Sequence, residues 1–336
     1  MGVCVQQLEG VRRISLDARS SGQSVLCITG PIDDGFWTRA LVVLYQADWA
    51  RTRGLPFVVF HNSSDAFNGV GGSNSWEQYF EPLTHGCLPA CLDAPPVPTV
   101  QLDACAAKQL WRDYARSYEL AMRTRAALSP LVATYVRPCA RVLALVDEFW
   151  RQRFPITSTS ILTRVLGVHM RGTDTKEPRI APAAYAELVR AYRCRHPQSR
   201  VFVASDDISA LRALHWLLAQ DSEAIVSQHA HRSADSTNPF QRRGELGDAS
   251  AAPGSSAHQQ QLGDEVLIDT LLLSRTDFLL KPRSFVSEFA TYFNPALQRS
   301  SYDFQLEGQP MPAWSAACEK MPSLAAFNPF APNNTA

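Results

Sequence analysis

Regular alternation of short apolar segments with longer amphipathic segments constrains the fold of this 336-residue chain more than any other feature. In the second half of the chain, the short segments have the length of strands and the segments between them the length of helices. Strands are expected at Arg164–Met170, Arg200–Ala204, Ala224–Ser227 and Asp277–Lys281. Helices are expected at about Pro182–Arg193, Ile208–Gln220, Asp264–Ser274 and Ser284–Phe293. This pattern predicts a doubly wound α/β domain built on a parallel sheet.

A shorter pattern of the same kind opens the chain. Strands at Ser24–Thr29 and Pro56–Phe60 flank a helix at Phe36–Arg53, which predicts a β-α-β unit. Two further helices are expected near Ala106–Arg125 and Arg141–Arg153. The length of the chain also fits two domains.

The domain boundaries follow from these patterns. We expect an N-terminal Rossmann-like domain over residues 1–163, a C-terminal Rossmann-like domain over residues 164–300, and a tail over residues 301–336. The segment Arg242–Gly263 is rich in Gly, Ser, Ala and Gln. Its composition predicts a flexible surface insertion in the C-terminal domain.

Composition argues against several functional classes. The 32 basic and 32 acidic residues give a net charge of zero, so general attraction to nucleic acid or anionic lipid is not expected. No apolar run approaches the roughly 20 residues that span a bilayer, and no signal peptide is expected at the start. His85, Cys87, Cys91 and Cys105 could form a metal site, but zinc sites usually show two close ligand pairs. Disulfide or free cysteines are favoured there, and no metal is expected.

Polar residues follow three of the predicted strands at the point where each strand ends. The three groups are His169-Met170-Arg171-Gly172-Thr173-Asp174, Ser205-Asp206-Asp207 and Pro282-Arg283-Ser284. The carboxyl ends of parallel strands meet at one edge of a sheet, and ligands of open α/β sheets bind beyond that edge. The sequence therefore predicts one site built from all three groups.

The residue types in this predicted site indicate a phosphorylated ligand. Arg171 can hold a phosphate through two parallel hydrogen bonds, and Gly172 would let the backbone approach the ligand. Ser284 is expected at a helix start, where free N–H groups attract anions. Asp269 lies in the apolar stretch "VLIDTLLL", where a buried carboxylate needs a donor such as guanine or a ribose hydroxyl.

Structural explanations of the same residues remain open. Arg171 and Asp174 could form an internal ion pair, and Asp206 or Asp207 could cap the next helix or, less favoured, bind a metal. Two residues could be explained by packing and backbone hydrogen bonds alone, namely His169 and Asp269. No G-x-G-x-x-G follows a predicted strand and no Walker phosphate loop is present, which argues against a dehydrogenase-type dinucleotide fold.

The stretch "GVHMRGTD" at residues 167–174 resembles the H-x-R-[RG]-T-D motif of the α-1,6- and protein O-fucosyltransferase superfamily. That group includes the core fucosyltransferases of N-glycans and the bacterial nodulation fucosyltransferases. "VFVASDD" at Val201–Asp207 and "LIDTLLLSRTDFLLKPRSFVSEF" at Leu267–Phe289 resemble further motifs, in matching order and spacing. The resemblance covers about Val165–Leu297, and "NSWEQYFEPL" at Asn74–Leu83 also looks like a segment of related proteins.

The resemblance implies a GT-B fold, in which two Rossmann-like domains face each other across a cleft. The N-terminal domain would lie on the acceptor side and the C-terminal domain would bind the donor nucleotide. The resemblance further implies GDP-fucose as the donor, inversion at the sugar carbon, and no metal or cofactor. By position, Arg171 resembles the arginine on the β-phosphate and Ser284 a phosphate-contacting serine. Residues around the guanosine or lining the site are matched by His169, Asp269, Asp174 and Asp207.

The sequence departs from the family pattern at several points. Gly172 replaces the second arginine of the common motif, and the lysine that often follows the aspartate is displaced to Lys176. "GPIDDGF" replaces the glycine-rich N-terminal loop. Glu177 falls where core fucosyltransferases carry a candidate base, so the expected catalytic residues are Arg171 with Glu177 or Asp174 as the proton acceptor.

The sequence thus favours a metal-independent, inverting fucosyltransferase. Its partners would be a nucleotide sugar and a glycan or glycoprotein acceptor. The alternatives are a GT-B enzyme that uses another nucleotide sugar, and a non-catalytic protein that binds sugar nucleotides or glycans. Family resemblance suggests the Golgi or the secretory pathway, whereas the sequence shows neither a signal nor an anchor, so the compartment stays open.

Overall fold

The computed structural model describes residues 11–15, 24–28, 35–52, 54, 57–59, 74–83, 117–155, 164–172, 178–228, 230 and 256–316. Several residues named from the sequence lie outside these ranges, namely His85, Cys87, Cys91, Cys105, Asp174, Lys176 and Glu177. No helix in the described ranges is long and apolar enough to cross a bilayer.

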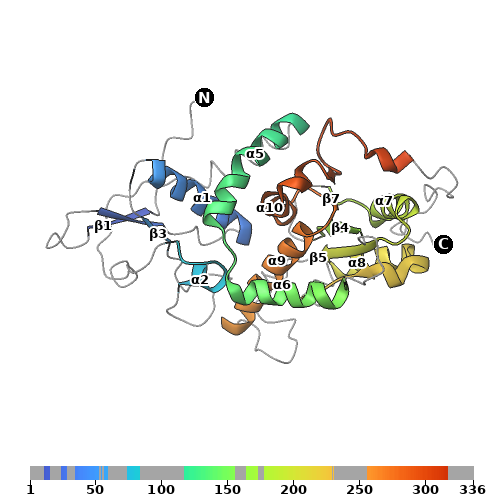
Figure 1. The fold of residues 1–336 in the computed structure, drawn as a ribbon, viewed down its shortest axis with the longest axis horizontal. Helices are drawn as coiled ribbons and strands as arrows, with labels where there is room; N and C mark the ends of the chain where they lie inside the picture. Colours follow the sequence, from blue (N-terminus) through green and yellow to red (C-terminus); the bar gives the residue numbers. More distant parts are fainter. Residues whose placement is uncertain are drawn as a thin grey trace, which may run out of the picture.

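A five-stranded, fully parallel sheet forms the centre of the second half of the chain (Figure 1). Its strands are β4 (Val165–Met170), β5 (Arg200–Ser205), β6 (Ile225–Val226), β7 (Phe278–Lys281) and β8 (Ser301–Asp303). The spatial order is β6-β5-β4-β7-β8. The α/β prediction is confirmed, and the ends of β5, β4 and β7 lie side by side as the sequence indicated.

The strand β8 was not predicted. Residues 301–336 were expected to be a tail, but Ser301–Asp303 pairs in parallel with β7, with Asp303 opposite Lys281. Three residues with two polar side chains carry too little apolar signal to be recognised as a strand. The tail prediction is wrong for this segment, which adds an edge strand to the sheet.

Helices cover both faces of this sheet. On one face, α7 (Pro182–Arg195) and α8 (Ile208–Leu217) pack against alternate strand residues such as Leu166, Val168 and Val203. On the other face, α9 (Ser256–Ser274) and α10 (Phe285–Phe293) pack against residues that include Phe202, Ala204 and Leu279. The short 3-10 helices are η1 (Ala219–Ala224), η2 (Pro295–Gln298) and η3 (Ala313–Ala316). The result is a three-layer α/β/α arrangement (Figure 1).

The first half forms a smaller sheet. Its strands β2 (Ser24–Ile28) and β3 (Phe57–Val59) are parallel and flank α1 (Phe36–Thr52), which confirms the predicted β-α-β unit. The strand β1 (Val11–Ser15), which was not predicted, pairs antiparallel with β2. This sheet lies at the opposite end of the molecule from α7 and α8 (Figure 1).

Helices from the first half pack directly on helices of the second half. Trp37 of α1 stacks on Phe289 of α10 with ring centroids 4.1 Å apart, and its Nε1–H donates to Thr270 Oγ1 of α9 at 2.9 Å. The short helix α2 (Ser75–Tyr79) and the helix α6 (Ala140–Arg153) contact α9. One hydrophobic core therefore includes residues from both sides of the predicted boundary at residue 163.

Of the helix expected at Ala106–Arg125, residues 106–116 lie outside the described residues, and the described part is helical beyond the expected end. Helix α5 runs over Tyr118–Tyr135, with the Ser117 side chain as its N-cap, and continues through Pro130. A proline usually disfavours a helix interior. Here the continuation buries Val132 and Tyr135, and α5 packs against α10.

The predicted flexible insertion Arg242–Gly263 is wrong over its last eight residues, because α9 begins at Ser256. Leu262 is buried, and the Tyr79 hydroxyl donates to the Gln260 carbonyl at 3.4 Å. A Cβ at Gly263 would lie 2.3 Å from the Tyr79 Oη, so the glycine permits the close contact between α9 and α2. Tertiary packing thus makes this polar segment helical.

Candidate functional site

The ends of β4 and β7 are joined by a hydrogen bond between two residues named from the sequence. Arg171, one residue past β4, donates from Nη1 to Ser284 Oγ at 3.1 Å. Ser284 is fully buried and is the N-cap residue of α10, but its side chain makes no capping bond. Its position at a helix start is as predicted. The guanidinium thus lies next to the positive end of the α10 dipole.

The end of β5 contributes two carboxylates that bond to the backbone around the site. Asp206 Oδ1 accepts from the Gly172 N–H at 2.7 Å. Asp207 caps α8, because its Oδ1 accepts from the N–H groups of Ser209 at 2.7 Å and Ala210 at 3.2 Å. The capping alternative is therefore confirmed for Asp207. The bond between Gly172 and Asp206 links the ends of β4 and β5, and the Asp207 bonds link the end of β5 to α8.

Gly172 has a packing role that the sequence did not reveal. A Cβ at this position would lie 2.3 Å from Asp207 Oδ2. The side chain of Asp207 therefore occupies the space that any larger residue at position 172 would need. The glycine expected to admit a ligand in fact admits Asp207, and the missing second arginine of the family motif has a steric explanation here.

His169 lies at the end of β4 and is almost completely buried. Burial, with smaller contributions from the charges of Arg171 and Lys281, lowers its pKa to about 3. The imidazole is therefore neutral at physiological pH. Its Nδ1 is buried and has no hydrogen-bond partner among the described residues. Buried polar atoms are usually hydrogen-bonded, so this nitrogen is a candidate for a hydrogen bond to a ligand.

Asp269 lies on α9, the helix that packs across β4 and β5. The residue as a whole is partly exposed, but its Oδ1 atom is buried, as the sequence suggested. Its neighbour Thr270 is fully buried and accepts the Trp37 hydrogen bond.

We call Arg171, Ser284, His169, Gly172, Asp206 and Asp207 the strand-end site. Asp174 and Glu177 lie outside the described residues.

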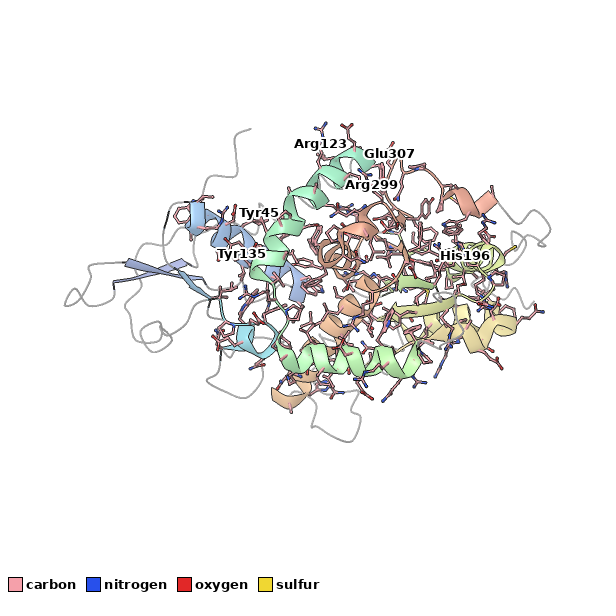
Figure 2. All side chains as sticks on the ribbon, viewed as in Figure 1. Tyr45, Arg123, Tyr135, His196, Arg299 and Glu307 are labelled. Atoms are coloured by element: carbon pink, nitrogen blue, oxygen red, sulfur yellow. The ribbon has the colours of Figure 1, made fainter. Side chains whose placement is uncertain are left out.

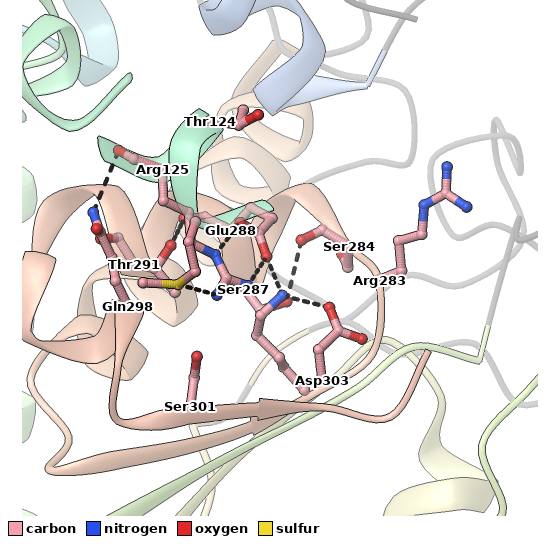
Figure 3. Close-up of polar contacts among 12 residues, drawn as sticks. Thr124, Arg125, Arg283, Ser284, Ser287, Glu288, Thr291, Gln298, Ser301 and Asp303 are labelled. Carbon is pink, nitrogen blue, oxygen red and sulfur yellow. Dashed lines mark hydrogen bonds and ion pairs between the residues drawn. The ribbon is translucent and has the colours of Figure 1, made fainter. Parts of the chain in front are cut away.

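A second group of charged residues, which sequence reasoning missed, lies beside the strand-end site. It consists of Arg125, Lys281, Glu288 and Asp303, with side chains that are 0–1% exposed (Figure 3). Arg125 donates to Glu288 from Nε at 3.1 Å and from Nη2 at 2.9 Å. Lys281 Nζ donates to Glu288 Oε1 and, at 2.9 Å, to Asp303 Oδ2. We call these four residues the buried charge cluster.

The charges within this cluster balance. Burial alone would raise the pKa of Glu288, but the positive charges of Arg125 and Lys281 outweigh burial and lower it to about 2. Two cations therefore face two anions. The contact between Arg125 and Glu288 joins residues 163 positions apart, so no local pattern in the sequence could have indicated it.

No group of three His, Cys, Asp or Glu side chains within the described ranges is placed to hold a metal ion. A small cavity lies away from the strand-end site, between the start of α1 and α2, and is lined by residues that include Phe36, Arg39, Trp76 and Tyr79. The polar groups at the ends of β4, β5 and β7 are therefore the strongest candidate for a functional site.

No known family model matches the chain, and no curated protein matches it. Its fold is similar to that of NodZ α-1,6-fucosyltransferase in a crystal soaked with GDP-fucose, with a TM-score of 0.45 and 16% identity over 80% of this chain and 92% of that one. For NodZ from Bradyrhizobium, the TM-score is 0.44 with 16% identity, over 79% and 91% of the two chains. For apo POFUT1, the TM-score is 0.29 with 15% identity, over 51% and 47%. The chain thus shows structural similarity to NodZ and POFUT1 at low sequence identity.

Proposed function

We propose that this protein is an inverting, metal-independent glycosyltransferase that transfers fucose from GDP-fucose to a hydroxyl of a glycan or glycoprotein. The observation that carries the proposal is the contact between Arg171 and Ser284 at the start of α10. It places a planar cation and a helix N-terminus together at the carboxyl edge of a parallel sheet, where nucleotide ligands bind.

Arg171 would meet the negative charge that develops on the departing diphosphate. In glycosyl transfer the sugar carbon becomes oxocarbenium-like while charge builds on the leaving phosphate. Donors that are already in position stabilise this charge without reorganisation. The bond to Ser284 and the dipole of α10 hold the guanidinium in such a position.

Recognition of the nucleoside would fall to His169 and Asp269. The neutral imidazole of His169 carries the buried Nδ1 described above, which can exchange a hydrogen bond with a base or a ribose. Asp269 would accept from guanine N–H groups. Asp207, through the carboxylate oxygen that does not cap α8, would line the site beside Gly172.

The remaining assignments of the proposal concern the whole architecture. We assign a GT-B arrangement with residues 1–163 on the acceptor side and residues 164–300 on the donor side. Asp174 or Glu177 would accept the proton of the acceptor hydroxyl.

The compartment would be an oxidising one such as the secretory pathway. Cys194 on α7 is disulfide-bonded, and disulfides are typical of oxidising compartments.

Donor hydrolysis followed by transfer to a glycan array tests the proposal. The purified protein should release GDP from GDP-fucose, transfer fucose to at least one arrayed glycan, and remain active in EDTA. Loss of activity in EDTA that manganese or magnesium restores would contradict the metal-independent mechanism. Binding of GDP without any turnover would instead support a non-catalytic binder, and turnover of a UDP-sugar alone would support a different donor.

A further inference from the structure

Gln305 connects two loops of the strand-end site through its side-chain amide. Its Oε1 accepts from the N–H of Arg283, the residue before Ser284, at 2.8 Å. Its Nε2 donates to the carbonyl of Pro178 at 2.8 Å. Pro178 precedes α7, which begins at Pro182. One amide therefore holds both the β7–α10 turn and the segment that precedes α7.

The buried charge cluster fixes the position of Gln305 itself. Asp303 accepts from Lys281 through Oδ2 at 2.9 Å and from the Gln305 N–H through Oδ1 at 2.9 Å. Between them, Phe304 donates its N–H to the Lys281 carbonyl at 3.0 Å and packs its ring on Tyr185 of α7. The backbone of Gln305 is thus held on both sides, so the amide is presented in a defined direction.

We propose that Gln305 is a positioning residue of the transferase reaction, which holds the β7–α10 turn at Arg283 and Ser284 against Pro178. The proposal rests on the proposed function and adds a residue from a segment that the sequence marked only as a tail. Gln305 acts through the two loops that it joins. The β7–α10 turn carries Ser284, which bonds to Arg171, and Pro178 directly follows Glu177 in the sequence. A shift of either attachment point would therefore act on residues that the proposed function uses.

Two substitutions at Gln305 separate its two contacts. Gln305→Ala removes the acceptor for Arg283 and the donor for Pro178. Gln305→Glu keeps an acceptor for Arg283, but at neutral pH it places a carboxylate against the Pro178 carbonyl. We expect Gln305→Ala to lower both GDP affinity and turnover. We expect Gln305→Glu to lower turnover while GDP affinity stays within about threefold of wild type.

Gln309 provides a matched control on the same segment. Its Oε1 accepts from the Asp303 N–H at 2.9 Å, and its Nε2 donates to the Ser301 carbonyl at 2.5 Å. Gln309→Ala therefore removes two hydrogen bonds of the same kind from β8, with no contact to either loop of the site. It should lower the melting temperature about as much as Gln305→Ala does and leave turnover unchanged.

The experiment compares the wild type with Gln305→Ala, Gln305→Glu and Gln309→Ala in transfer kinetics, GDP affinity and residue-level amide exchange of the unliganded protein. Turnover should fall on the order of tenfold to a hundredfold in both Gln305 variants, because small misplacements of reacting groups lower reaction rates by about this much. Exchange of the Arg283 amide should accelerate in Gln305→Ala alone.

Equal kinetic effects of Gln305→Ala and Gln309→Ala would overturn the inference. If the wild type neither binds GDP nor cleaves the donor, the proposed function fails. The claim that Gln305 holds the two loops is then decided by the Arg283 amide, since unchanged exchange in Gln305→Ala would overturn that claim too.

Discussion

Two groups of charged residues lie at neighbouring strand ends of one sheet, and they differ in how completely they are enclosed by the protein. In the buried charge cluster, Arg125 and Lys281 are enclosed with Glu288 and Asp303, and the four formal charges sum to zero. In the strand-end site, the Arg171 guanidinium bonds to the neutral hydroxyl of Ser284. The Asp206 and Asp207 carboxylates there bond to backbone N–H groups.

This difference separates a structural role from a ligand-binding role. Removing one member of an enclosed, balanced cluster leaves a buried charge without compensation, so its loss should act on folding. The strand-end site also includes the N-terminus of α10, where free N–H groups and the helix dipole attract an anion. The predictions below ask whether stability and activity divide between the two groups in this way.

The largest expected effect is on stability, from Glu288→Ala. The substitution strands Arg125 and Lys281 in the core, and removing one partner of a buried ion pair typically costs about 3–5 kcal/mol of unfolding free energy. Chemical denaturation measures it. Glu119→Ala is the control, because it breaks a surface ion pair with Arg123 on α5, the helix that also carries Arg125 (Figure 2). Equal losses in the two variants would show that the buried cluster is not a major contributor.

The next effect should fall on activity, from Arg171→Lys. Lysine keeps the charge but loses the planar two-donor group. Removing one preorganised donor of this kind typically lowers turnover about a hundred- to a thousand-fold. We expect that loss with a small change in melting temperature. Arg137→Lys, which alters a surface pair with Glu81, should leave both unchanged, and a folded Arg171→Lys enzyme with near-normal turnover would exclude the catalytic role.

A smaller effect should appear as a pH dependence of stability caused by His169. Its pKa is about 3 in the folded protein and about 6.5 when unfolded. Between these values the unfolded state binds the additional proton, so acidification below pH 6.5 destabilises the fold, by up to about 1.4 kcal/mol per pH unit. The stabilising effect is complete above pH 6.5 and is lost as the pH falls toward 3.

Unfolding free energies of the wild type and His169→Gln at pH 7 and pH 5 measure this contribution. Glu288, whose pKa falls from 4.5 to about 2, contributes little to this difference and is present in both proteins. His196→Gln is the control at a less buried imidazole, which packs beside Tyr192. If His169→Gln has the same pH dependence as the wild type, the imidazole is not held neutral in the fold.

Much of the second half of the chain could be predicted from its sequence. The apolar runs of β4, β5 and β7 and the periodic helices between them are strong local signals, and their observed ends lie close to the predicted ones. The meeting of Arg171 and Ser284 followed from sheet geometry alone, because both residues stand where neighbouring parallel strands end.

The features that the sequence did not reveal depend on contacts between distant segments. Strand β8 is defined by its pairing with β7, and the start of α9 by contacts of Leu262 and Gly263 with the rest of the protein. The bond between Arg125 and Glu288, and the two contacts of Gln305, join residues more than 20 positions apart. The periodicity of apolar residues indicates which face of a helix or strand is buried. It does not indicate which polar side chain of a distant segment will lie opposite a given residue.

The most direct test of the central claim, that the strand-end site binds a guanosine diphosphate, is ligand-dependent thermal unfolding of the wild type and Arg171→Lys with GDP, UDP and ADP. GDP at a hundred times its dissociation constant should stabilise the wild type by about 2.7 kcal/mol. At the same concentrations UDP and ADP should stabilise it less, and GDP should stabilise Arg171→Lys less. Stabilisation by UDP without any by GDP, or equal stabilisation of both proteins by GDP, would contradict the assignment.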